Sequence, residues 1–400
     1  AMGNVYLEGN FAPVTEEVDR ECVEVEGEIP KDLAGFFLRN GPNLALPPLD
    51  EALYHPFDGD GMIHQLQFEN GKATYRNRWI QTAGLARERA AGKALWGGFA
   101  TIGKTEPPAD MPFKNLANTA LCWQAGKLLA TWEAGSPYVV GLPAMETKGE
   151  TTFDGGWTSA VSAHPKVDPR TGELIVFCYS PMEQPHVRYG VVDASGKVVH
   201  QTGVELPGGP VMIHDMAITE NYSLIFDMPV TFSLERIMNG GQAFAWEPGN
   251  GTRIGVLPRY AEGSEVKWFD VQTGYIFHAF NAFEEGDEIV IDACLSPTTS
   301  ILGETDVPID EERARFHNYR LNLTSGAVTE GRVSEIPLEF ARVNEGYIGT
   351  KTRYGYASRF ANDPINLRFS ALLKYDRGGD QIETVDLPEK VFSQEFVFAP

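Results

Sequence analysis

The sequence is poor in cysteine, in long apolar runs and in positive charge, and each shortage excludes a class of protein. Its cysteines, Cys22, Cys122, Cys178 and Cys294, lie far apart without a CxxC pair, so they predict neither a disulfide framework nor a zinc knot. No run approaches the ~18 consecutive apolar residues of a membrane-spanning helix.

Positive charge is scarce as well. Lys and Arg number 33 against 55 Asp and Glu, which gives a net charge of −22. Such a chain lacks the basic face that a nucleic-acid backbone requires. We therefore expect an acidic cytoplasmic protein without a nucleic-acid partner, with membrane association or a plastid as the alternative locations.

Helix-period patterns are also few, whereas glycine (41 residues) and proline (26 residues) are abundant. This balance favours many short strands joined by tight turns. Residues 64–68 and 73–80 are predicted strands, and Asn70-Gly71 between them suits the positive φ of a hairpin turn. Similar turns recur at 125–127, 168–172, 194–196, 219–221, 284–287, 324–326 and 376–379.

Hairpins at intervals of a few tens of residues are typical of four-stranded propeller blades. Two segments, 83–95 and 232–238, predict short helices. Because no glycine- and serine-rich linker and no charge run separates domains, we predict an all-β protein in which residues 1–400 form one continuous domain.

Three of the eight histidines occupy similar places in this strand pattern. His164 ends an apolar segment before a hairpin, His214 opens a strand pair, and His278 lies in an aromatic strand. They are 50 and 64 residues apart, about one blade each. Since the innermost strand of each blade lines a propeller's axis, such residues converge. We expect a metal site, for which iron, copper, nickel and zinc all suit imidazole; a hydrogen-bonded core histidine is the alternative at each position.

The other histidines predict no ligand. His55 and His64 flank a turn-rich loop at 56–62, which we interpret as structural. His186, His200 and His317 are expected at surface or hairpin positions.

Several longer motifs carry a family resemblance: GNFAPV at 9–14, FLRNGP at 37–42, FDGDGM at 57–62, AHPKVDP at 163–169 and IHD at 213–215. In this order they resemble the carotenoid cleavage oxygenases, and the likeness runs along nearly the whole chain. It implies a seven-bladed β-propeller with a helical or loop dome over an axial iron site. It also implies that Fe(II), held by four histidines, uses O2 to split a conjugated C=C bond into two carbonyl products.

Matched residue by residue, His164, His214 and His278 correspond to the first three ligands of that family. The fourth family histidine lies some tens of residues farther along, and this chain ends at Pro400. We therefore expect that part of the family's C-terminal segment is absent from this chain.

The resemblance also implies glutamates behind the ligands, and the matching positions here are Glu133, Glu339 and Glu395. A carboxylate that accepts the remote N–H of an imidazole fixes its tautomer and ring angle and makes it a better donor. Thr119 matches a threonine that crowds an open coordination position in related enzymes.

A polyene substrate requires an apolar tunnel, and aromatic residues flank the matched positions. Phe277 precedes His278, Phe340 follows Glu339, and Trp132 stands before the matched Glu133. Stilbene-cleaving relatives carry a lysine at this last place to hold a phenol oxygen. A tryptophan offers no cation, so a carotenoid or apocarotenoid is favoured over a lignostilbene.

A carotenoid resides in membranes, so peripheral membrane contact is expected. Leu85, Trp96 and Phe99, in segment 83–99, lie near an apolar patch of relatives, although they can equally pack inward. Two further alternatives are a retinoid-type isomerase, which uses the same iron centre, and a non-catalytic propeller that binds partners.

Overall fold

The computed structural model describes residues 3–22, 24–102, 104–299 and 307–399. The chain divides into two compact units, Ala1–Ala163 and His164–Pro400, each of which we describe by itself. The single continuous domain expected from the sequence stays a prediction.

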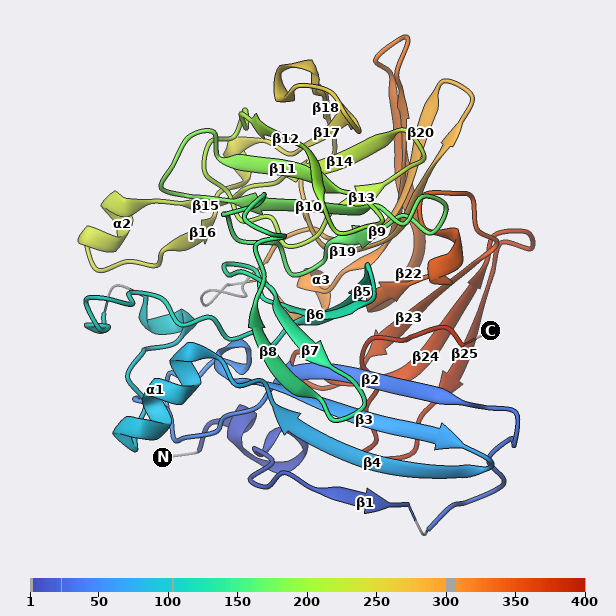
Figure 1. The fold of residues 1–400 in the computed structure, drawn as a ribbon. Coiled ribbons are helices and arrows are strands. Elements are labelled where there is room, and N and C mark those ends of the chain that lie inside the picture. The colour runs from blue at the N-terminus through green and yellow to red at the C-terminus, as the bar shows by residue number, and fades with distance from the viewer. Residues whose placement is uncertain (1–2, 23, 103, 300–306, 400) are drawn as a thin grey trace. The chain divides into compact units, whose positions relative to one another are not determined.

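Unit 1, blue to green in Figure 1, is built from two antiparallel four-stranded sheets. The first has the order β1 (Asp19–Glu21), β4 (Lys72–Trp79), β3 (Gly61–Glu69), β2 (Gly35–Pro42), and the second runs β5 (Ala120–Gln124), β6 (Lys127–Thr131), β7 (Tyr138–Gly141), β8 (Glu146–Glu150). Short 3-10 helices complete this unit: η1 (Val5–Leu7), η2 (Gly9–Phe11), η3 (Pro56–Asp58) and η4 (Phe99–Thr101).

The predicted helix at 83–95 is present as α1 (Ala83–Ala91) but ends earlier. The side chain of Thr82 accepts the N–H of Leu85 at 3.1 Å and caps its start. Gly92 follows with φ +69, the left-handed conformation that ends a helix and that glycine adopts without steric cost.

Unit 2 contains two further four-stranded sheets, a two-stranded ribbon and a seven-stranded sheet. The four-stranded sheets are β12 (Val198–Val204), β11 (Val187–Val192), β10 (Leu174–Tyr179), β9 (Lys166–Val167), and β13 (Ala217–Ile218), β14 (Tyr222–Asp227), β17 (Arg253–Pro258), β18 (Lys267–Asp270). The ribbon pairs β15 (Val230–Phe232) with β16 (Phe244–Trp246). Short helices are α2 (Leu234–Met238), α3 (Ile309–Glu312), η5 (Pro248–Asn250), η6 (Gly263–Glu265) and η7 (Glu345–Tyr347).

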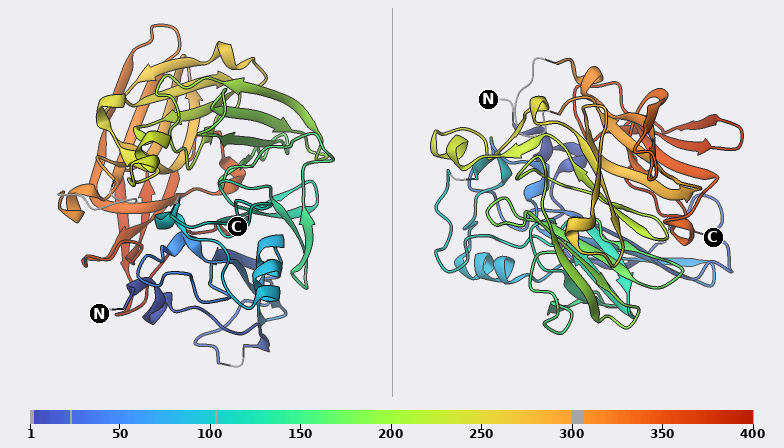
Figure 2. Two further views of the ribbon diagram at one scale, coloured as in Figure 1. Left: turned by 90° about the vertical axis from the view of Figure 1, so that its left-hand side faces the viewer. Right: turned by 90° about the horizontal axis from the view of Figure 1, so that it is seen from above.

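The seven-stranded sheet runs in chain order, and its later strands are orange to red in Figure 2. Its members are β19 (Tyr275–Glu285), β20 (Glu288–Ser296), β21 (Arg315–Asn322), β22 (Val328–Arg342), β23 (Tyr354–Phe360), β24 (Phe369–Asp376) and β25 (Gln381–Asp386). The long strand β22 pairs with β21 up to Pro337 and with β23 from Leu338 onward. The strand β22 therefore belongs to two blade-like halves of four strands each, β19–β22 and β22–β25.

The all-β prediction is confirmed, and so are the predicted hairpins, because each predicted turn joins two paired strands. With β22 counted in both halves, the described residues form six four-stranded sheets. A seventh blade and a dome stay predictions. The helix expected at 232–238 begins at Leu234, because Phe232 ends β15 and the side chain of Ser233 accepts the N–H of Arg236 at 3.1 Å.

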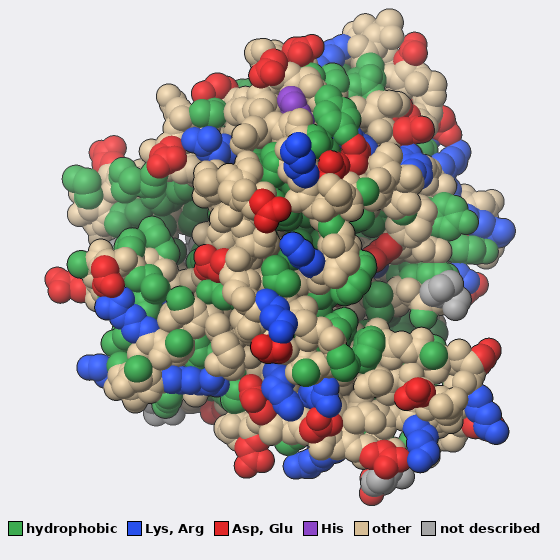
Figure 3. Space-filling model, in the orientation of Figure 1, with side chains coloured by type: hydrophobic (Ala, Val, Ile, Leu, Met, Phe, Trp, Pro, Cys, Tyr) green, Lys and Arg blue, Asp and Glu red, His purple; other side chains and the backbone are tan. Residues whose placement is uncertain are grey.

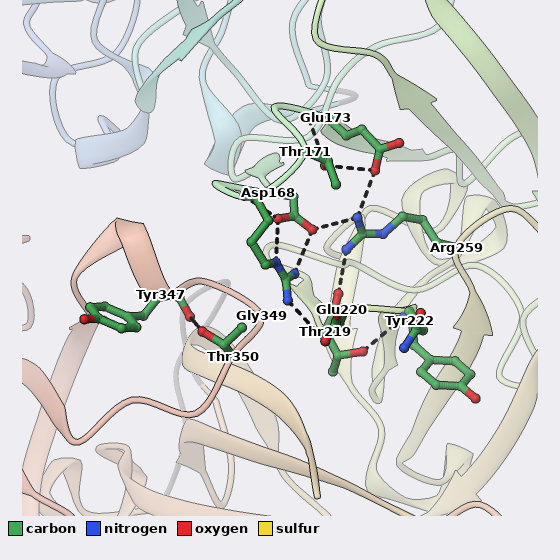
Figure 4. A network of polar contacts seen from close by, with 12 residues as sticks. Asp168, Thr171, Glu173, Thr219, Glu220, Tyr222, Arg259, Tyr347, Gly349 and Thr350 are labelled. Atoms are coloured by element: carbon green, nitrogen blue, oxygen red, sulfur yellow. Dashed lines mark hydrogen bonds and ion pairs between the residues drawn. The ribbon is translucent and has the colours of Figure 1, made fainter.

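Inner strands of unit 2 are apolar on both faces, which explains their continuous hydrophobic runs. Most residues of β10 and β20 are buried. Between the sheets, buried Arg259 donates to Asp168 and Glu173 at 2.7 and 2.9 Å and to the carbonyl of Thr219 at 2.5 Å (Figure 4). This charge network links the sheet of β9 and β10 to that of β13 and β17.

Of the two alternatives for segment 83–99, an exposed apolar patch or inward packing, inward packing holds for Leu85 and Trp96. Leu85 is 0% and Trp96 8% exposed, since Leu85 packs against Met62 and Trp79 in the core of unit 1. Among the described residues, none of the helices has the length and apolar character needed to cross a membrane. On the face shown in Figure 3, basic side chains are interspersed with acidic ones.

Candidate metal centre

The three histidines singled out above lie at equivalent places in three consecutive sheets of unit 2. His164 comes two residues before β9, His214 three residues before β13, and His278 lies near the start of β19. Each of these strands is the first of its sheet in chain order and stands at its edge. Figure 1 places the labels of β9, β13 and β19 close together. The repeat of the sheets therefore brings together residues that are far apart in sequence.

The three imidazole rings meet. One ring nitrogen of each histidine lies within 4.8 Å of those of the other two. The Nε2 atoms of His164 and His214 are 3.0 Å apart. Ring centroids are separated by 4.7 Å for His164 and His214, 5.0 Å for His164 and His278, and 5.2 Å for His214 and His278. This convergence matches the geometry expected from the sequence, and the role of the three as ligands stays a prediction.

Burial and mutual repulsion keep part of this cluster neutral. His164 is 7% exposed, and burial, followed by its neighbours His214 and His278, holds its pKa well below the ordinary value. A neutral imidazole keeps a lone pair on one nitrogen, which is the form that binds a metal ion.

Glu339 contacts His278, and its role as an orienting residue stays a prediction. Its Oε2 atom accepts Nδ1–H of His278 at 2.5 Å, so that Nε2 of the neutral ring carries the lone pair. Burial opposes the charged form of His278, yet Glu339, with Glu395 and Asp215 behind it, raises the pKa to about 9. A metal ion at Nε2 must therefore compete with a proton.

Two β-bulges shape this part of the site. The register of β19 with β20 shifts between Ile276 and Ala279, on either side of His278, and that of β22 with β23 shifts after Glu339. Phe340 has φ +58, and its N–H donates to Glu339 Oε2 at 2.5 Å. Bulges redirect side chains and are frequent beside active sites. Strained backbone at a non-glycine residue is likewise concentrated at functional sites.

Glu395 faces Nε2 of His278, whereas Glu339 contacts the other ring nitrogen, Nδ1. An orienting carboxylate is expected at the nitrogen that does not bind the metal. The Oε1 atom of Glu395 is 3.5 Å from His278 Nε2, and its Oε2 atom is 3.6 Å from the guanidinium of Arg342. Its role as an orienting residue stays a prediction.

Aromatic side chains lie beside the histidine rings within unit 2. Phe277 lies 5.9 Å from the ring of His214, and Phe340 lies 5.4 Å from that of His278. Phe340 in turn contacts Phe369 at 4.8 Å between centroids. These rings give the cluster an apolar wall, which suits an apolar substrate and restricts water.

The remaining predicted site residues, Thr119, Trp132 and Glu133, belong to unit 1 and gather at one end of the β5–β6 hairpin. The N–H of Thr119 donates to the carbonyl of Thr131 at 3.0 Å, and Trp132 and Glu133 follow Thr131 directly. Within unit 1 these three residues therefore lie close together, and their roles toward the histidines stay predictions.

Of the surface or hairpin position expected for His317, the hairpin holds and the surface does not. His317 lies within β21 and is only 3% exposed, because its Nε2 contacts Glu330 Oε2 at 2.9 Å across the β21–β22 pair. The cross-strand carboxylate allows a polar ring to be buried. His55 and His64 make structural contacts as expected, His55 Nδ1 accepting the N–H of Phe57 at 3.2 Å and His64 Nδ1 lying 2.6 Å from the Tyr75 hydroxyl.

Two polar residues of the site escaped sequence reasoning. Asp215 is 2% exposed and contacts the segments of all three histidines, and Lys166 Nζ donates to it at 2.7 Å. The available signal was their place in the AHPKVDP and IHD motifs, one or two residues from a predicted ligand. Phe369 was also missed, because it is distant in sequence from every ligand.

The donor set fits a transition-metal ion. Imidazole nitrogen is a common ligand of iron, copper, nickel and zinc. Glu339 is 7% exposed, and its Oε1 atom has no hydrogen-bond partner among the described residues. A buried carboxylate requires nearby positive charge, which a cation held by the imidazoles would supply. The fold and the cluster define a class, that of all-β proteins of blade-like sheets with a three-histidine centre fit for a metal.

Comparison with known proteins gives the family. The family model of retinal pigment epithelial membrane protein matches residues 11–400. Carotenoid 9,10(9',10')-cleavage dioxygenase 1 of Phaseolus vulgaris is 34% identical over 434 residues, which cover 99% of this chain and 78% of that protein. The chain belongs to this carotenoid oxygenase family.

Two other similar proteins are named for isoeugenol and for lignostilbene. Isoeugenol monooxygenase of Pseudomonas putida is 36% identical over 328 residues, covering 80% of this chain and 68% of that protein. The crystal structure of lignostilbene dioxygenase of Pseudomonas brassicacearum superimposes with a TM-score of 0.90 at 28% identity, covering 99% of this chain and 86% of that one.

Proposed function

We propose that this protein is an Fe(II)-dependent dioxygenase that cleaves a conjugated C=C bond of a carotenoid or apocarotenoid with O2, giving two carbonyl products. The observation that carries the proposal is the convergence of His164, His214 and His278 within 4.8 Å of one another in a member of this family. When bound there, ferrous iron supplies the chemistry that adds oxygen to the double bond.

The residues of unit 2 have separable tasks in this proposal. His164, His214 and His278 hold the ion through neutral ring nitrogens. Glu339 keeps the proton of His278 on Nδ1, so that Nε2 stays available to the metal. Phe277 lies beside the ring of His214 and lines the place of the polyene, where it excludes water.

Phe340 has the same task beside His278. Glu133 and Glu395 are proposed as further orienting carboxylates, Thr119 as the residue that crowds an open coordination position, and Trp132 as part of the substrate wall. A fourth histidine ligand stays an expectation from the family resemblance.

Cleavage of a phenylpropene or a stilbene is the second candidate. It is favoured by the 36% identity to isoeugenol monooxygenase and by the TM-score of 0.90 to lignostilbene dioxygenase. The presence of Trp132 instead of a lysine speaks against a phenol-binding cation at that place, and the carotenoid proposal rests on this difference.

Aerobic incubation of the iron-loaded protein with a carotenoid, an apocarotenal, isoeugenol and a hydroxystilbene tests both candidates, with products identified by mass. Under ¹⁸O2 we expect cleavage of the carotenoid or apocarotenal, with label in both carbonyl products. Cleavage of isoeugenol or the stilbene alone would establish the second candidate. Conversion that continues under argon would indicate the isomerase, and iron-loaded protein inert toward all four compounds would favour the binding propeller.

We also propose transient contact with a lipid surface, because a carotenoid partitions into membranes. Within unit 2 the contact is supported by α2, where Leu234 is 49% and Met238 82% exposed. Leu85 and Trp96 are not part of it, because both side chains are buried. A cytoplasmic location stays a prediction. Co-sedimentation with liposomes tests the contact, and replacement of both α2 side chains by Ser is expected to reduce it.

A further inference from the structure

The strands that carry two of the three histidines are very short. Both β9 and β13 have two residues, and each pairs with its neighbour at two positions only. His164 and His214 stand before these strands, outside the ladder of backbone hydrogen bonds. Such segments need further restraints if their side chains are to meet at one point.

A single carboxylate supplies restraints to all three histidine segments. Asp215 Oδ1 accepts from Lys166 Nζ, two residues after His164, at 2.7 Å. The same oxygen accepts the N–H of Met216, in the segment of His214, at 2.7 Å. Asp215 Oδ2 accepts the N–H of Ala279, next to His278, at 2.9 Å. The side chain is 2% exposed, so these contacts replace its hydration.

The contact with Ala279 falls at the β-bulge of β19. The register with β20 shifts between Ile276 and Ala279 and again between Ala279 and Asn281. A bulge interrupts the regular ladder and turns the strand, so that a side chain is redirected. Asp215 accepts the backbone N–H at this irregular place and so holds the turn that presents His278.

Asp227 is a second buried aspartate of unit 2 and serves as a comparison for Asp215. It is 0% exposed, accepts from Arg253 at 3.0 Å and accepts the N–H of Gly208 at 2.9 Å. It therefore resembles Asp215 in burial, in its cationic partner and in its backbone contact. Its partners, however, lie in segments without a histidine of the cluster.

We propose that Asp215 is a positioning residue that holds the three histidine segments in the arrangement required to bind the metal. The inference rests on the metal centre of the proposed function and adds to it a residue that touches neither metal nor substrate. Replacement of one of its two acceptor oxygens by an amide NH2 group is expected to weaken metal binding and to change the coordination geometry, whereas the same change at Asp227 affects the fold alone.

The test is an anaerobic titration of the full chain with Co(II), which is followed by ligand-field absorption and by competition with a chelator. We expect Asp215→Asn to weaken Co(II) binding by about ten- to a hundredfold and to alter the absorption bands. Asp227→Asn is the matched control, and its Co(II) affinity and bands are expected to equal those of the wild type within about twofold.

Lys166→Met is the second variant, and it serves if Asp215→Asn fails to fold. It removes one of three contacts and is expected to weaken Co(II) binding by about three- to tenfold. Wild-type affinity and bands in a folded Asp215→Asn, or in Lys166→Met should the former not fold, would overturn the proposal while leaving the metal centre intact. A wild-type chain that binds no Co(II) would overturn the metal centre and this proposal with it.

Discussion

The two ends of the short strands β9 and β13 carry opposite kinds of polar chemistry. At one end stand His164 and His214, whose Nε2 atoms face each other at 3.0 Å. At the other end, Asp168 follows β9 and Thr219 follows β13, and Arg259 donates to both. The second end is buried and its charges are paired, whereas at the first end His164 is buried and His214 is partly exposed.

The charged groups around Arg259 pair with one another: Arg259 contacts Asp168 and Glu173, and Arg170 contacts Asp168. Burial opposes the charged form of Asp168, yet hydrogen bonds from Arg170 and Arg259 hold its pKa below the ordinary value. At the histidine end, like groups converge and the carboxylates stand behind the rings. Converging imidazoles with a carboxylate behind one ring are an arrangement that suits an added cation. The comparison therefore separates a network that is paired within the protein from a cluster whose donor set suits a metal ion.

The largest effect is expected for His214→Ala. Removal of one of three imidazoles should eliminate iron binding and lower turnover by roughly a thousandfold or more, because metal assistance is worth several kcal/mol. Iron content and product formation are the measurements. His317→Gln is the control, since His317 is also buried and paired with a carboxylate but lies outside the cluster. Equal iron content in His214→Ala and the wild type would refute the ligand assignment.

Arg259→Met should act on the other end of the strands. It leaves Asp168 without one of its two arginine partners, and loss of a buried charge partner costs about 3–5 kcal/mol of unfolding free energy. Urea unfolding measures this cost. Iron bound per folded chain should equal that of the wild type, and a parallel loss of iron would show that the two ends are not independent.

Glu339→Gln should weaken metal binding without destroying the fold. The amide accepts less strongly from His278 Nδ1 than the carboxylate does at 2.5 Å, and loss of such a partner lowers metal affinity by about ten- to a hundredfold. Chelator competition gives the affinity. The matched control is Glu330→Gln, which changes the carboxylate beside His317 and should leave metal affinity unaltered.

The smallest effect concerns a histidine of unit 1 with a purely structural role. Burial, with repulsion from Arg39, lowers the pKa of His64 to about 4. Because this lies below the ordinary value near 6.5, the unfolded chain takes up the proton first. Stability present above pH 6.5 is therefore lost as the pH falls toward 4, by about 1–2 kcal/mol after allowance for solvent screening.

Urea unfolding of the wild type and of His64→Gln at pH 7 and pH 4.5 checks this prediction. The difference between the two proteins should shrink at the lower pH. A difference that stays constant would mean that His64 is not held neutral by the fold.

Sequence reasoning reached the strands and the histidines for a physical reason. Turns such as Asn70-Gly71 are local, because glycine adopts positive φ in any context. The histidines were found because the sheets repeat, so that a spacing of 50 and 64 residues leads back to the same place. The resemblance supplied Glu339, which spacing alone could not mark.

Features that depend on several distant residues were beyond sequence reasoning. The burial of His317 depends on Glu330 across a strand pair, and the contacts of Asp215 depend on Ala279 at a bulge. The inward packing of Leu85 likewise follows from its neighbours in the core. A pattern in one segment contains no information on such partners.

X-ray absorption of the protein loaded with Fe(II) under argon tests the central claim most directly, because the outer-shell scattering of imidazole rings can be counted. The account predicts one iron per chain with at least three imidazole ligands, and the loss of this signal in His278→Ala. Iron bound without imidazole scattering, or an unchanged spectrum in His278→Ala, would contradict it.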